Sequence, residues 1–216
     1  HSDNLYLNKA LFQRIKMLYD KRSTLGLTAE QNRLLEKYYK NFVRNGAALN
    51  DEQKEKLREI NKQLSLAELQ FGQNVLAETN AYQKWVTDEK ELAGLPENVK
   101  QSAAEAAKEA GREGQWLFTT KKASFIPVLQ YSENRELRRE LLTAYNKLAD
   151  NNNANDNKPV INKIVKLRVQ KAQLLGYPTW ADYELDDTMA KTPQKVYDFL
   201  ASVWEPSIRK AREEAA

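Results

Sequence analysis

The two residue types that carry much of enzyme chemistry are almost missing from this chain. Its 216 residues include no Cys and one His, which is His1 at the first position. Without thiols the chain can form no disulfide, no cysteine nucleophile and no Cys-ligated metal site. With one imidazole it cannot build a Ser–His triad or a two-histidine zinc site by itself. The sequence therefore predicts no catalytic, no cofactor-binding and no metal-ligating residue here.

The 30 Asp and Glu residues leave carboxylate chemistry open. Asp186 and Asp187 are adjacent, and neighbours on a helix diverge by about 100°, so we expect a helix end or loop and no converging pair. The spacing of Glu184 and Asp187 allows convergence but is too common to indicate a site. Carboxylates alone therefore predict no reaction.

An asparagine-rich stretch, Asp150–Asn157, invites comparison with a calcium loop. A calcium-binding EF-hand loop needs an oxygen ligand at its fifth position and Glu at its twelfth. Here those positions hold Ala154 and Ile161. The match fails, and the stretch is interpreted as a solvated loop between helices.

The charge pattern indicates solvated helix faces. Lys and Arg total 34 against 30 acidic residues, which gives a net charge of +4 and a pI near 9.0. Basic residues alternate with acidic ones, as in Lys54–Lys56, and the cluster Arg135, Arg138 and Arg139 has Glu neighbours. Nucleic-acid binding would need clustered cations, and neither of the glycine-rich nucleotide motifs occurs. We expect no nucleic-acid partner, and the short apolar runs predict no membrane span.

The scarcity of Gly (7) and Pro (6) argues for long helices. Capping residues mark three helix starts, at Asn8, at Thr28 with Gln31, and at Asn50 with Gln53. The expected fold is mainly α, with helical hairpins and a bundle, and a short Gly turn joins the second helix to the third in an antiparallel hairpin. Tyr82–Thr87 and Trp116–Thr120 predict a small two-stranded β element, connected through an alanine-rich helix.

Apolar periodicity gives the expected inward faces. These are Leu34, Leu35, Tyr38, Tyr39, Phe42 and Val43; Leu57, Ile60, Leu64, Ala67, Phe71 and Val75; Leu137, Leu141, Leu142 and Tyr145; and Val196, Phe199, Leu200, Val203 and Trp204. Ser124–Tyr131 contains Pro127 and is expected to be irregular or edge-like. We treat 1–216 as one helical lobe, with subdivisions expected at 80–131, the small β-containing insert, and at 150–158.

The last segment, Val196–Ala216, keeps helical spacing to its final residue without a Gly cap or Pro stop. We therefore expect a piece of a longer protein. If the partner of that helix is missing, its apolar stripe around Phe199, Val203 and Trp204 is exposed, and self-association of the piece is expected.

An ordered set of segments resembles the thimet-oligopeptidase-like zinc metallopeptidases over essentially the whole chain. The set comprises Leu64, Phe71–Asn74, Leu92–Pro96, Pro127–Tyr131, Asn134–Arg138, Asn155–Arg168, Ala172–Tyr177, Trp180–Tyr183 and Met189–Pro193. Within the family, residues 152–192 look most similar to the bacterial peptidyl-dipeptidases, with the oligopeptidase A branch next.

The resemblance implies a parent protein made of two helical lobes around a channel that admits short peptides. Its zinc would be held by an H-E-x-x-H helix and a downstream Glu, where the first Glu activates a zinc-bound water. This sequence lacks that motif, so no family catalytic or zinc residue is carried onto it. The resemblance thus implies an inactive piece that lacks zinc and contacts a missing catalytic lobe. A stand-alone helical binding or scaffold module is the alternative. The absence of Cys suits a cytoplasmic location, with the periplasm as the alternative.

Overall fold

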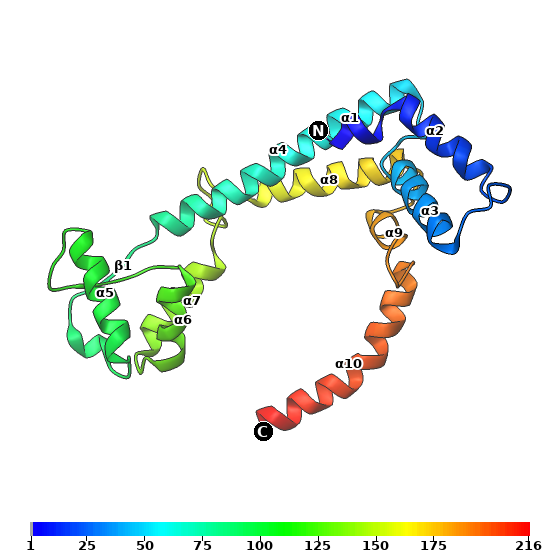
Figure 1. The fold of residues 1–216 in the computed structure, drawn as a ribbon. Helices are drawn as coiled ribbons and strands as arrows, with labels where there is room; N and C mark the ends of the chain where they lie inside the picture. Colours follow the sequence, from blue (N-terminus) through cyan, green and yellow to red (C-terminus); the bar gives the residue numbers. More distant parts are fainter. Residues whose placement is uncertain (1) are drawn as a thin grey trace. The chain divides into compact units, whose positions relative to one another are not determined.

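The computed structural model describes residues 2–216, and these form ten α-helices, one short 3₁₀ helix and two strands (Figure 1). The mainly helical fold with a small β element is confirmed. Contacts divide the chain into two compact units, one comprising residues up to Ser65 with Ile164–Ala216 and the other Leu66–Lys163. The elements are α1 (Ser2–Tyr6), α2 (Lys9–Asp20), α3 (Ala29–Arg44), α4 (Asp51–Ala81), β1 (Lys84–Val86), η1 (Glu89–Leu92), α5 (Glu97–Glu109), β2 (Trp116–Phe118), α6 (Lys122–Tyr131), α7 (Arg135–Asn146), α8 (Lys158–Leu174), α9 (Trp180–Leu185) and α10 (Pro193–Ala215).

Three helices start where their capping residues predict. The Asn8 side chain accepts from the Leu11 backbone at 3.0 Å and begins α2. Thr28 and Gln31 form a complete capping box before α3. Asn50 and Gln53 exchange the same pair of bonds at the start of α4. Each box satisfies backbone N–H groups that a helix start otherwise leaves unpaired.

The first unit has an aromatic core between α2 and α3. Phe12 is stacked with Tyr39 at 5.9 Å and with Phe42 at 6.3 Å, measured between ring centroids. Gly46 ends α3 with φ of 90°, and a Cβ there would lie 2.4 Å from Leu57 Cδ2, so the turn requires glycine. In this unit α2 and α3 pack against each other most extensively. The sequence predicted the antiparallel hairpin between α3 and α4 instead.

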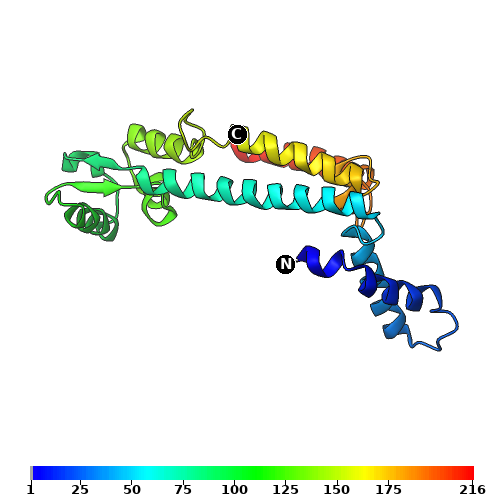
Figure 2. The same cartoon turned by 90° about the horizontal axis from the view of Figure 1, so that it is seen from above.

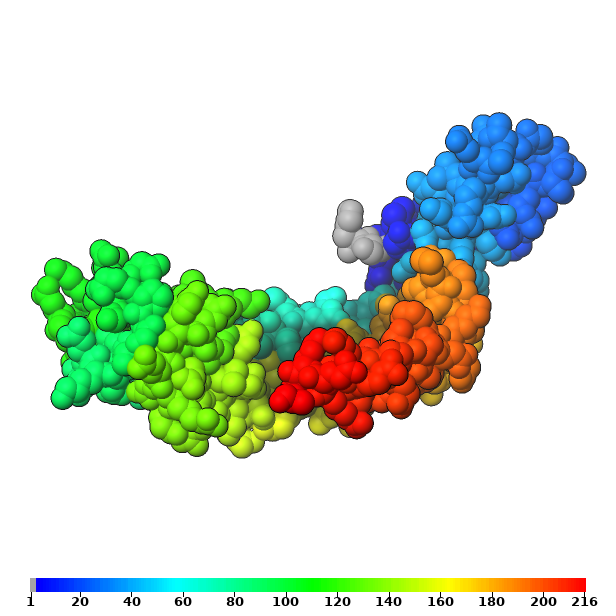
Figure 3. Space-filling model, turned by 90° about the horizontal axis from the view of Figure 1, so that it is seen from below, coloured from blue at the N-terminus to red at the C-terminus, as the bar shows by residue number. Residues whose placement is uncertain are grey.

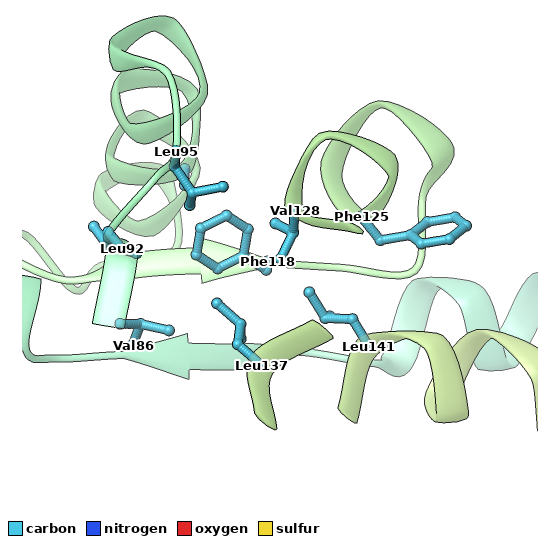
Figure 4. Packing of buried hydrophobic residues seen from close by; sticks show 9 residues of the cluster. Val86, Leu92, Leu95, Phe118, Phe125, Val128, Leu137 and Leu141 are labelled. Atoms are coloured by element: carbon cyan, nitrogen blue, oxygen red, sulfur yellow. The ribbon is translucent and has the colours of Figure 1, made fainter. Parts of the chain in front are cut away.

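The second unit contains the β element. β1 and β2 pair antiparallel, with Trp85 opposite Leu117, and α5 packs on β2 (Figures 1 and 2). Both strands lie inside the predicted segments, although each has only three residues. Figure 4 shows the core that this element shares with α6 and α7. Its buried members are Val86, Leu92, Leu95, Ala103, Phe118, Phe125, Val128, Leu137 and Leu141.

The prediction for Ser124–Tyr131 is wrong, because α6 is helical through Pro127. A proline inside a helix costs about 3 kcal/mol. Phe125 and Val128 are 4% and 0% exposed, and burying a side chain of this size contributes about 1.5–3 kcal/mol. The tertiary burial of one helical face therefore offsets the local penalty (Figure 4).

Several residues expected to face inward are exposed. Among the described residues α10 has no buried member, and Phe199 and Trp204 are 65% and 62% exposed. This corrects the inward face predicted for Val196–Trp204 and agrees with the exposed stripe expected where the partner of that helix is missing. Figure 3 shows α10, in orange to red, open to the surface. The other exposed side chains that were expected inside are Leu34, Tyr38, Phe71 and Leu142. Periodicity identifies an apolar face but not what covers it.

None of the described helices is both long enough and apolar enough to cross a bilayer.

Candidate functional site

Asp186 and Asp187 lie at the end of α9, in the first unit, as the sequence predicts. Asp186 is the C-cap residue of α9. The Lys40 ammonium, from α3, lies 3.0 Å from Asp187 Oδ1 and 3.6 Å from Asp186 Oδ2. The two carboxylates therefore share a lysine, which pairs with both of them. Sequence reasoning missed Lys40 because 146 residues separate it from Asp186.

Arg44, the last residue of α3, fixes this cluster. Its guanidinium donates to Asp186 Oδ2 and to the Tyr183 carbonyl oxygen, each at 2.7 Å. It also lies 4.7 Å from the Tyr183 ring centroid, within cation–π range. The Tyr177 hydroxyl donates to Asp186 Oδ2 at 3.2 Å. Arg44 thus holds the backbone and the carboxylate at the end of α9 together.

The electrostatics of the cluster favour charged side chains. Burial opposes the ionisation of Asp186, but the bond from Arg44 and the charge of Lys40 outweigh it, so the pKa of Asp186 lies below its ordinary value. The bond and charge of Lys40 likewise lower the pKa of Asp187. Burial is the main cause that raises the pKa of the Tyr177 hydroxyl. At neutral pH both carboxylates are ionised and are matched to Lys40 and Arg44.

Beside this cluster lies a cleft of about 890 Å³, which we call the α3 cleft. One wall is α3, with Arg33, Lys37, Lys40 and Arg44, and the other is the turn after α9. That turn contributes Met189 and Lys191, and Met189 is 99% exposed. The size is in the range of small-molecule ligand pockets. The cleft therefore has charged walls and room for a ligand.

A second polar cluster lies in the second unit, around Glu78 of α4. This carboxylate is only 8% exposed. It accepts hydrogen bonds from the Ala149 backbone N–H at 3.0 Å and from the side-chain amides of Asn151 and Asn153. Burial opposes its ionisation, but the bonds from Asn153, Ala149 and Asn151 outweigh it and lower its pKa.

The Asn-rich stretch is therefore anchored, although the sequence suggested only a solvated loop. Near Glu78, Asn74 donates to the Asn157 side-chain oxygen at 2.9 Å. Because Asn74 and Glu78 are four residues apart, they share one face of α4. Their spacing is visible in the sequence, but their burial is not, so the sequence holds no signal specific to this anchor. N–H donors surround the Glu78 carboxylate, so the cluster is suited to holding a loop, not a cation.

A metal site would need several ligating side chains close together. Across residues 2–216, His, Cys, Asp and Glu side chains form no group of three or more that would hold a metal ion. His1 lies outside the described residues. Of the basic cluster singled out from the sequence, Arg139 pairs with Glu136 on an exposed face, and Arg138 donates to the Ser132 carbonyl oxygen.

Residues 128–216 match the model of Peptidase family M3. The chain is 34% identical over 215 residues to a dipeptidyl carboxypeptidase from Escherichia coli, covering 100% of this chain and 32% of that protein. It is 36% identical over 197 residues to an oligopeptidase A from Haemophilus influenzae, covering 89% of this chain and 29% of that protein.

A probable cytosolic oligopeptidase A from Arabidopsis thaliana is 33% identical over 212 residues, covering 94% of this chain and 30% of the relative. The chain thus spans about a third of the length of these curated relatives. The family resemblance predicted from the ordered segments is confirmed.

Proposed function

Since this chain is related to peptidase family M3, we propose that it is the non-catalytic, N-terminal-side lobe of a zinc-dependent peptidase that hydrolyses short peptides. The observation that carries the proposal is the 34% identity to a dipeptidyl carboxypeptidase, which extends over 100% of this chain. The same relative is about three times as long as the matched region, which leaves room for a catalytic lobe elsewhere in the protein. We favour the peptidyl-dipeptidase branch, with oligopeptidase A as the neighbouring one.

The zinc of such an enzyme does not fit this chain. Zinc in hydrolases needs three nitrogen or oxygen ligands from the protein and an open position for water. Residues 2–216 contain no His and no Cys, and the described carboxylates form no metal-holding group. We therefore place the zinc ligands and the general base in the remainder of the protein, and we derive no catalytic step for this lobe.

The proposed role of this chain is to form one wall of the peptide channel and to contact the catalytic lobe. α10 is the surface suited to that contact. Phe199 and Trp204 are more than 60% exposed, and Leu200 is 51% exposed. Monomers rarely leave large contiguous apolar patches in water. In the whole protein we expect another segment to cover this face, and in the isolated chain we expect a second copy to do so.

For location we propose the cytoplasm, since one relative carries the name cytosolic oligopeptidase A. The periplasm remains the alternative prediction from the sequence.

The test of the proposal is the gene sequence beyond the codon for Ala216. An H-E-x-x-H motif followed by a third acidic ligand supports a zinc peptidase. An open reading frame that closes without such a motif overturns the proposal and leaves the stand-alone binding or scaffold module.

A further inference from the structure

Charged and aromatic side chains line the α3 cleft, and the ion pairs inside it do not neutralise all of its positive charge. Its lining includes five cationic and three anionic side chains, which leaves a net charge of two positive. The pairs Arg33–Glu36, Lys40–Asp187 and Arg44–Asp186 account for all three acids.

Two lysines supply the unmatched charge. Within the described part of the chain, Lys37 has no ion pair within 4.0 Å, and it lies in the middle of the α3 wall. Lys191 donates to the Asp186 carbonyl oxygen at 3.4 Å and makes no ion pair with a described carboxylate within that limit. Both side chains are exposed, so their ammonium groups are available to an anionic ligand.

The cleft also offers apolar contact. Tyr19 and Tyr39 line it with their ring edges, because their faces are stacked on each other at 3.9 Å and covered by Arg22 and Phe12. Met189, fully exposed on the opposite wall, has a flexible thioether side chain that adapts to different partners. A ligand with both carboxylate and apolar groups therefore fits this lining better than a purely ionic one.

The length of the basic wall limits the ligand that can lie along it. Arg33, Lys37, Lys40 and Arg44 recur every three or four residues, so they form one stripe along α3. At 1.5 Å of rise per residue the stripe is about 16 Å long. An extended peptide covers that distance with about five residues.

We propose that the α3 cleft binds short acidic peptides, in an extended form of about five residues, through Lys37 and Lys191. The ligand class rests on the proposed function, which makes peptides the molecules handled by the whole protein. Nucleic acid fits less well, because Glu36, Asp186 and Asp187 interrupt the cations and would repel a continuous row of phosphates. A peptide can place separate carboxylates at the two lysines and an apolar side chain against the exposed Met189.

The test is a fluorescence anisotropy titration of the 216-residue chain at low salt. The probe is a labelled five-residue peptide with glutamate at both ends and leucine in the centre, compared with its glutamine counterpart. The proposal expects the glutamate peptide to bind about tenfold more tightly or better. It also expects this preference to weaken strongly when ionic strength rises to about 0.3 M.

A double variant, Lys37→Glu with Lys191→Glu, should weaken binding of the glutamate peptide about tenfold or more. The matched control, Lys166→Glu with Lys195→Glu, makes the same change of charge outside the cleft and should leave binding within about twofold. Circular dichroism melts confirm that both variants fold.

The proposal is overturned if the glutamate and glutamine peptides bind equally well. It is also overturned if the cleft variant and the control variant lose the same affinity for the glutamate peptide. Tighter binding of a single-stranded oligonucleotide of the same charge also overturns it, in favour of a general polyanion surface. The readout is binding without hydrolysis. If the peptide does not bind but the gene encodes the zinc motif, only the proposal for the α3 cleft is rejected. If the gene lacks the zinc motif, the proposed function is rejected.

Discussion

Replacing Glu78 by Gln should destabilise the second unit by removing the acceptor that anchors the Asn-rich loop. The carboxylate accepts from the Ala149 backbone N–H and from the Asn151 and Asn153 amides. Hydrogen bonds to a charged group contribute about 1.5–3 kcal/mol each. The glutamine side chain keeps one accepting oxygen but turns its NH₂ group toward other donors. The free energy of unfolding should therefore fall by about 2–4 kcal/mol.

The effect should depend on pH in a defined direction. The pKa of Glu78 in the folded chain lies below its ordinary value of 4.5. The unfolded chain therefore binds the proton more readily, and the stabilisation is complete above pH 4.5 and is lost as pH falls through the folded value. The difference between wild type and Glu78→Gln should be largest at neutral pH and should shrink in acid.

Urea unfolding followed by circular dichroism measures the free energy, and amide hydrogen exchange at Ala149 reports the anchor itself. The Ala149 N–H should lose protection in the variant. Glu89→Gln is the matched control, because Glu89 is exposed in the same unit and its change should stay within about 0.5 kcal/mol. Identical unfolding curves for the two variants, or unchanged protection at Ala149, would refute the reasoning.

Three further substitutions test other parts of the structure. Leu64→Ala should cost about 2–5 kcal/mol in urea unfolding, because Leu64 is only 7% exposed, and a cost near zero would contradict its burial. Gly46→Ala should lower the melting temperature, because its φ of 90° and the 2.4 Å approach to Leu57 leave no room for a Cβ; an unchanged melt would argue against that turn. Trp204→Lys should reduce the concentration-dependent self-association of the chain in light scattering; a wild type that is monomeric at every concentration would show that α10 needs no partner.

Features that depend on a few neighbouring residues were predictable from the sequence. The capping box of Thr28 and Gln31 forms because its partners are three residues apart. The strands at Trp85 and Trp116 follow from local β-branched and aromatic composition, although their pairing is not local.

Features that depend on distant partners were not predictable. Arg44 and Asp186 are 142 residues apart, and the Ala149 N–H lies 71 residues from Glu78. No local pattern specifies either pair. For α10 the sequence supported two expectations, an inward face and a stripe left exposed without its partner, because an apolar stripe is the same signal whether or not something covers it; the structure bears out the second. Pro127 shows the opposite case, in which a local penalty is outweighed by burial of its neighbours.

We propose above that this chain is the zinc-free lobe of a zinc peptidase. Metal analysis after dialysis, with a fluorogenic peptide assay, should be run in parallel on the 216-residue chain and on the complete product of its gene. The account predicts one zinc per molecule and chelator-sensitive hydrolysis for the complete product, and neither for the chain alone. Chelator-sensitive turnover by the 216-residue chain, or a complete product without zinc and activity, would contradict it.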